Sequence, residues 1–166
     1  MKAEMEVSVS VTTLVELIKD AEKAPKWISR VYSFENAEII SEYEWYTYSE
    51  VSIPWPFNDK DLVTYNILTY SLPDSSAFIE SESKPEYIEE KEKRSRIKNY
   101  HGSWTFTPME NGNTQVVYKV YSQSSGGLPA WLVTPLVANG IHDTLQEMRE
   151  QLEEVSVKNE EVRMKN

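Results

Sequence analysis

The chain has 166 residues, no cysteine and two histidines, and its 27 acidic and 17 basic residues give a net charge of −10. This length fits one domain whose core is large enough for stability without disulfides or metals, and the composition excludes disulfide frameworks, thiolate metal sites and cysteine nucleophiles. The acidic balance argues against nucleic acid as a partner and allows at most transient contact with anionic membranes.

Neither a secretory signal nor a membrane span is predicted. The first six residues, Met1 to Glu6, lack the apolar segment of a signal peptide. No stretch approaches the roughly 18 apolar residues that a transmembrane helix needs. We therefore expect a cytoplasmic protein. With so few potential ligands in the sequence, we expect no metal and no cofactor.

The start of the chain reads as a strand followed by two short helices. Apolar residues alternate with polar ones from Met5 to Val11, which predicts a half-buried strand. Thr13 and Glu16 have the spacing of a capping box, which predicts a helix that begins at Thr13. Pro25 disfavours helical backbone at the preceding residue, so a short second helix carrying Trp27 should follow a break.

The middle of the chain, from Val31 to Gln123, contains only strand and turn patterns. Turn residues separate the predicted strands, notably in the Pro73-Asp74-Ser75-Ser76 and Asn111-Gly112-Asn113 segments. The predicted strands are 31–41, 43–53, 61–72, 76–84, 93–107 and 114–123.

A long helix is predicted to follow Gly127, from Leu128 to about Glu154. Its apolar residues recur at three and four positions and so form a single face. They are Val133, Val137, Ile141, Leu145 and Met148. Residues 156–166 carry charges without periodicity, so we expect a frayed tail after a single domain formed by residues 1–155.

These elements predict an α+β helix-grip fold: a curved antiparallel sheet of about seven strands wrapped around the long C-terminal helix. Alternation places Thr47 on one face of its strand and Asn66 on one face of the next, each among large apolar residues. Such a mixture is typical of a ligand pocket. A solid core with internally bonded polar groups fits the same pattern, because periodicity does not detect a cavity.

Four segments also resemble START domains. They are VELIKD with PKWI (15–28), PWPFNDKDLV (54–63), GSWTFTP (102–108) and GGLPAWLV (126–133). The resemblance implies a START-like, birch-pollen-allergen-like fold of the SRPBCC superfamily, with an internal hydrophobic tunnel that binds a lipid or another apolar molecule. Lys60 replaces the arginine of the family pattern and loses bidentate pairing with a carboxylate. Where sterol-binding members place an acid and a base, this chain has the neutral Thr47 and Asn66.

The predicted tunnel-lining residues combine the strand faces, the glycine-containing strand near residue 102 and the apolar helix face. They are Trp45, Thr47, Val51, Asn66, Leu68, Ile79, Gly102, Trp104, Phe106, Val137, Ile141, Leu145 and Met148.

A gate is predicted where the C-terminal helix is weakest. Pro135 removes a backbone donor, and Gly140 costs about 1 kcal/mol in a helix interior. In START-like proteins the loop that contains Asp74 and Ser75 is expected to face this part of the helix, so the loop and the helix are predicted to open together.

No catalytic residue is predicted. His142 and Asp143 are helix neighbours that point about 100° apart, and His101 and Ser103 share a strand face without a third partner. The main hypothesis is therefore a binding or transport module for an apolar ligand. The alternatives are an aromatase/cyclase-type enzyme acting on polyketide-like substrates in the same pocket, and a protein-interaction module with an exposed apolar patch.

Overall fold

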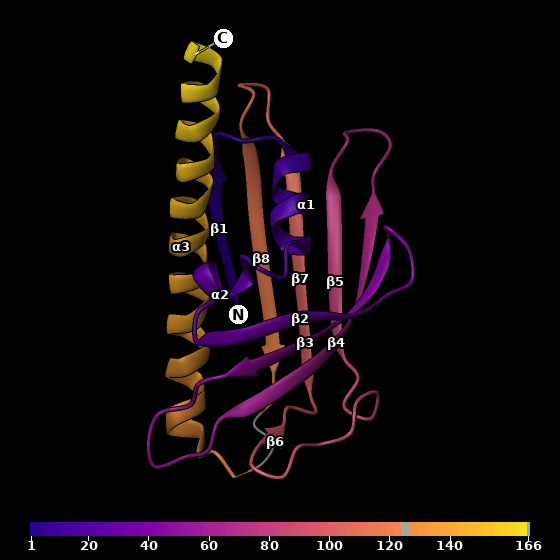
Figure 1. Ribbon diagram of the computed structural model, residues 1–166, viewed down its shortest axis with the longest axis vertical. Coiled ribbons are helices and arrows are strands. Elements are labelled where there is room, and N and C mark those ends of the chain that lie inside the picture. The colour runs from indigo at the N-terminus through magenta and orange to yellow at the C-terminus, as the bar shows by residue number, and fades with distance from the viewer. Residues whose placement is uncertain (124–126, 166) are drawn as a thin grey trace.

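The computed structural model describes residues 1–123 and 127–165, with side chains described up to Glu154. Figure 1 shows a curved sheet and a long helix that runs the length of the molecule. The elements are β1 (Lys2–Val7), α1 (Val11–Lys19), α2 (Ala24–Trp27), β2 (Val31–Ile39), β3 (Glu44–Val51), β4 (Lys60–Tyr70), β5 (Ala77–Ser83), β6 (Ser95–Arg96), β7 (Tyr100–Pro108), β8 (Thr114–Ser122) and α3 (Ala130–Lys165).

The strands form one open sheet in the order β1-β8-β7-β5-β4-β3-β2, and every pair along this path is antiparallel. The short β6 lies off this path and pairs with β4 in parallel. Strands β1, β8, β7 and β5 run alongside α3, whereas β2 and β3 cross the molecule toward it (Figure 1). The predicted helix-grip fold is confirmed.

The first turn of α1 differs from the prediction. Ser10, in extended backbone, is the N-cap, and its hydroxyl accepts a hydrogen bond from the Thr13 amide at 3.2 Å. Thr13 therefore lies inside the first turn, and the predicted capping box of Thr13 and Glu16 is wrong. The strand before it ends at Val7 rather than at Val11, because the chain needs the intervening residues to turn into the helix.

Helix α3 is longer than predicted, since it continues past Glu154 to Lys165. Pro135 lies within this helix without ending it. No helix in the described part of the chain combines the length and the apolar character needed to cross a bilayer.

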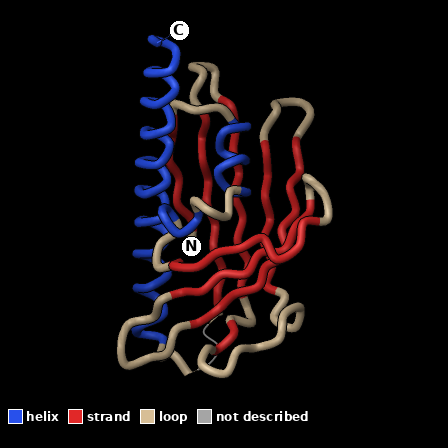
Figure 2. The backbone as a smooth tube through the Cα atoms, viewed as in Figure 1, coloured by secondary structure: helices blue, strands red, loops and turns tan. Residues whose placement is uncertain are grey.

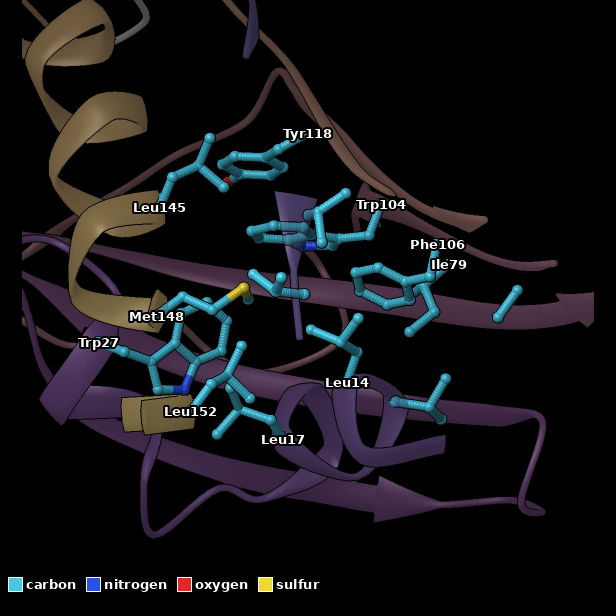
Figure 3. Close-up of a cluster of buried hydrophobic side chains, with 14 of the residues drawn as sticks. Leu14, Leu17, Trp27, Ile79, Trp104, Phe106, Tyr118, Leu145, Met148 and Leu152 are labelled. Atoms are coloured by element: carbon cyan, nitrogen blue, oxygen red, sulfur yellow. The ribbon is translucent and has the colours of Figure 1, made fainter. Parts of the chain in front are cut away.

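Figure 2 shows the helices on one side of the sheet strands. The core is a cluster of buried side chains between the sheet and the helices α1, α2 and α3 (Figure 3). Leu14 projects from α1 toward Ile79 and Phe106 of the sheet, and Met148 reaches the same cluster from α3 (Figure 3). All four of these side chains have 0% exposure, so this part of the interior is tightly packed.

Candidate ligand-binding cavity

A cavity of about 280 Å³ lies between the sheet and the first half of α3. This volume is close to the lower end of the range of small-molecule pockets, about 300–1,000 Å³. Strands β2, β3, β4 and β8 supply much of the wall, in part through Val31, Val51, Leu62 and Val120. The walls are mainly apolar, which suits an apolar occupant.

Two tryptophans lie where the cavity borders the core. Trp27 and Trp104 line the cavity and also belong to the core cluster. Their rings meet edge to face, with centroids 5.9 Å apart. Trp104 also stacks on Tyr118 at a centroid distance of 3.8 Å. Figure 3 shows Trp27, Trp104 and Tyr118 within the core cluster, so these aromatic contacts form part of the wall that the cavity and the core share.

A neutral polar cluster lies on the sheet side of the cavity. Asn66 accepts hydrogen bonds at Oδ1 from the hydroxyls of Ser81 (2.7 Å) and Thr64 (3.1 Å), and its amide donates to the Trp45 carbonyl (3.1 Å). Thr47 and Thr64 share a further hydroxyl hydrogen bond at 2.5 Å. Because these groups satisfy one another, the cluster costs little when it is buried, and its hydroxyl oxygens keep lone pairs that can accept a hydrogen bond from a ligand hydroxyl.

Two buried phenols occupy the β7–β8 side of the cavity. Burial raises the pKa of Tyr100, and burial together with the neighbouring Tyr100 raises the pKa of Tyr118 well above its usual range. The Tyr100 ring lies over Gly102, where an added Cβ would overlap its hydroxyl oxygen. Gly102 is therefore required because it leaves room for Tyr100, not for a ligand.

The charged side chains among the described lining residues are Lys60 and Arg30. Lys60 is only 4% exposed, and its ammonium donates to the Ser95 hydroxyl at 2.8 Å. Burial lowers the pKa of Lys60. Arg30 is exposed at the rim, so the two cations mark one end of the cavity.

The opposite face of β4 carries a buried ion pair directly behind the cavity. Arg96 donates to both carboxylate oxygens of Asp61, at 2.6 and 3.1 Å, and Tyr48 donates to Asp61 at 2.9 Å. The same guanidinium donates hydrogen bonds to the backbone carbonyls of Pro85 and Ile88. Burial acts to raise the pKa of Asp61, but the hydrogen bonds from Arg96 and Tyr48 outweigh it and hold that pKa below its usual range. This network fixes the β5–β6 segment against the outside of the sheet.

The structure brings about half of the predicted lining residues together. Those on the cavity wall are Trp45, Thr47, Val51, Asn66, Trp104, Val137 and Ile141. The wall also includes residues that were not predicted to line it, among them Trp27, Lys60, Tyr100 and Tyr118. The alternation of Tyr118 with Val120 on β8 was a signal that pointed to one of them.

The remaining predicted residues do not line the cavity. Leu68, Ile79, Phe106, Leu145 and Met148 are buried in the core cluster, and Gly102 lies under Tyr100. They share faces with lining residues, but Leu14 and Leu17 of α1 fill the space that they face. Helix α1 thus turns the far half of the predicted tunnel into packed core.

The structure places the two parts of the predicted gate, the loop and the helix segment, far apart. Gly140 lines the cavity, and Pro135 lies within α3 nearby. The loop with Asp74 and Ser75 lies at the far end of β4, away from the start of α3 (Figure 1). An 11-residue strand at about 3.4 Å per residue separates its ends by roughly 35 Å. This loop therefore cannot close on residues 132–136, and opening at Pro135 and Gly140 stays a prediction.

The two histidines lie outside the cavity. His101 pairs with Glu80 at 2.9 Å on the exposed face of the sheet, and His142 is exposed on α3. Among the described residues, no group of three or more His, Cys, Asp or Glu side chains is placed to hold a metal ion.

The fold and its cavity define a START-like helix-grip protein. A crystal structure of a STAR-related lipid transfer protein from Xanthomonas axonopodis superposes with a TM-score of 0.85 at 24% identity, covering 92% of this chain and 84% of that one. Human StAR-related lipid transfer protein 5 gives a TM-score of 0.79 at 14% identity, with 93% and 76% covered. The START-like fold implied by the resemblance is confirmed.

The family follows from the sequence itself. Residues 1–157 match the model of a family described as polyketide cyclase / dehydrase and lipid transport, and the chain belongs to that family. It is also 27% identical over 144 residues to the uncharacterized protein PA1579 of Pseudomonas aeruginosa, covering 87% of this chain and 70% of the relative.

Proposed function

We propose that this protein binds a lipid or another apolar small molecule in the cavity between the sheet and α3, without transforming it. The observation that carries the proposal is the cavity wall, which is mainly apolar and whose central polar groups, Thr47, Thr64, Asn66 and Ser81, hydrogen bond to one another. Apolar walls give affinity, and sparse polar groups orient the ligand. The lipid-transfer proteins that share the fold support the same assignment.

The test uses a neutral apolar probe and a variant that fills the cavity. Val137 lies on the cavity wall, so Val137→Phe should occupy part of the space and weaken binding of cis-parinaric acid methyl ester, measured by fluorescence, by about tenfold or more. Asn139→Phe is the matched control, because it adds the same ring to an exposed position on the same helix. Equal binding by wild type and Val137→Phe would refute the assignment of the site.

A cyclase-type enzyme is the second candidate, because Tyr100 and Tyr118 place two protonated phenols in the cavity wall. Phenols can donate protons to a ligand carbonyl during ring closure. Incubation with a linear tetraketide, followed by mass spectrometry, separates the candidates. If each substrate molecule loses one water with wild type but not with Tyr100→Phe, the protein is an enzyme. If the mass of the substrate stays unchanged, the result favours the binding protein.

A further inference from the structure

The neutral polar cluster of Thr47, Thr64, Asn66 and Ser81 reaches the inner part of the cavity, next to the core. Asn66 pairs with Ser81 across β4 and β5, and Ile79, two residues before Ser81, already belongs to the core cluster. Along β4, Asn66 lies roughly 20 Å from the Lys60 end of the strand, at about 3.4 Å per residue. A ligand group that meets this cluster therefore lies deep inside the protein.

Each hydroxyl proton of the cluster has an acceptor within the cluster. The hydroxyls of Thr64 and Ser81 both donate to Oδ1 of Asn66, at 3.1 and 2.7 Å. Because the single Thr64 proton is used there, the 2.5 Å hydrogen bond between Thr47 and Thr64 has Thr47 as its donor. The direction of every hydroxyl in the cluster follows from these contacts.

The orientation of the Asn66 amide supports this assignment. Its nitrogen donates to the Trp45 carbonyl at 3.1 Å and faces the Thr64 carbonyl at 3.5 Å. Both carbonyls are acceptors only, so they require the nitrogen, and the amide oxygen is left for the hydroxyls of Thr64 and Ser81. The amide hydrogens are thus directed to the backbone of the sheet.

The cluster therefore presents acceptors to the cavity. A hydroxyl oxygen has one proton and two lone pairs. Thr47 and Ser81 direct their protons to other members of the cluster, and both residues line the cavity. An ether oxygen, a carbonyl oxygen or an ionised carboxylate would meet these lone pairs with lone pairs of its own. A ligand hydroxyl would donate to them.

We propose that the cavity takes a neutral apolar molecule with a hydroxyl in its inner part, and that Thr47 and Ser81 accept the hydrogen bond from this hydroxyl. This inference rests on the proposed function. Thr64 and Asn66 are positioning residues, because they accept the protons of Thr47 and Ser81. The rest of the molecule extends along the mainly apolar walls toward the rim.

A phenol on the neighbouring strand complements the same ligand group. Gly102 pairs with Ser81, and the Tyr100 ring lies over Gly102. Burial raises the pKa of Tyr100, which keeps its phenol protonated. A hydroxyl can both donate and accept a hydrogen bond, so it suits a wall in which acceptors and a phenol lie on adjacent strands.

The experiment compares cis-parinaryl alcohol with its methyl ether, which has the same chain. Both probes accept hydrogen bonds, so donors such as Tyr100 affect them alike, but only the alcohol donates. In fluorescence titrations, we expect wild type to bind the alcohol about fivefold or more tightly than the ether, because one neutral hydrogen bond contributes a factor of that order.

Variants of the two acceptors test where this preference arises. Thr47→Val combined with Ser81→Ala should bring the alcohol-to-ether affinity ratio to about one or below, and Thr47→Val alone should lower it by about twofold or more. Thr47→Ser keeps the hydroxyl and should retain the wild-type ratio. Thr69→Val is the matched control, because Thr69 is exposed on β4 outside the cavity, and its ratio should equal that of wild type.

Two outcomes would overturn the hydroxyl site while leaving the binding function intact. One is equal affinity of wild type for alcohol and ether. The other is a wild-type ratio in both Thr47→Val and the double variant, with circular dichroism showing that the proteins are folded. If neither probe binds wild type, the proposed function fails together with this inference.

Discussion

The space beneath α3 has a solid half and a hollow half, and the same strands contribute to both. In the solid half, Leu14 of α1 packs against Phe106 and Met148, and all three side chains have 0% exposure. In the hollow half, Leu62 and Val137 face a cavity of about 280 Å³. The difference comes from α1, whose Leu14 and Leu17 fill the solid half, whereas α2 and the first half of α3 cover the cavity.

Behind the hollow half, the outer face of the sheet carries a buried network. The buried pair of Asp61 and Arg96 lies behind β4 at the level of the cavity, with side-chain exposures of 1% and 0%. Arg96 also binds carbonyls of the segment that covers this face. The comparison therefore suggests a division of roles, in which side chains between the sheet and the helices stabilise the solid half and the outer face of the sheet contributes a buried network behind the cavity.

The largest expected effect on the free energy of unfolding comes from removing this network on the outer face of the sheet. Arg96→Met leaves the Asp61 charge buried without its partner and should lower the free energy of unfolding by about 3–5 kcal/mol, measured by urea denaturation. Lys84→Met, which breaks an exposed ion pair with Glu82, should cost less than about 1 kcal/mol. Similar losses in the two variants would show that the network does not support the hollow half.

A matched pair of leucines compares the two halves directly. Leu14→Ala opens a void in packed core and should cost about 2–5 kcal/mol. Leu62→Ala removes a half-buried side chain that already faces a cavity, and it should cost about 1–2 kcal/mol. Thermal and urea unfolding of both variants provide the test, and an equal cost would mean that the cavity closes in solution.

Acid should weaken the network before it affects the solid half. The folded pKa of Asp61 lies below its unfolded value of about 3.9. The contribution of Asp61 is therefore fully present above that value and is lost as pH falls through the lower folded pKa. Stability measured between pH 5 and about pH 2.5 should fall less steeply in Asp61→Asn than in wild type. Parallel curves would assign the acid sensitivity to other carboxylates.

The sequence predicted the fold well because alternation, turn residues and the apolar face of the last helix are local signals. It also identified lining residues such as Thr47, Asn66 and Val137, whose strand or helix faces point inward. It could not identify where the cavity ends, because Phe106 and Trp104 share a face and only the position of α1 distinguishes them. Lys60 was noted for its place in a motif, and its burial in the cavity depends on packing between distant segments.

The wall of the cavity differs in exposure from one place to another. Trp27 and Trp104 lie where the cavity borders the core, whereas Arg30 and Gln123 are exposed at its rim. A molecule bound inside would therefore reach solvent beside Arg30 and Gln123 rather than beside the indole rings. Bulky groups attached to the end of the molecule that meets the indole rings should prevent its binding, whereas substituents at the rim end should project into solvent. That asymmetry makes the rim end the place to attach a fluorophore or an affinity resin when the natural occupant is sought.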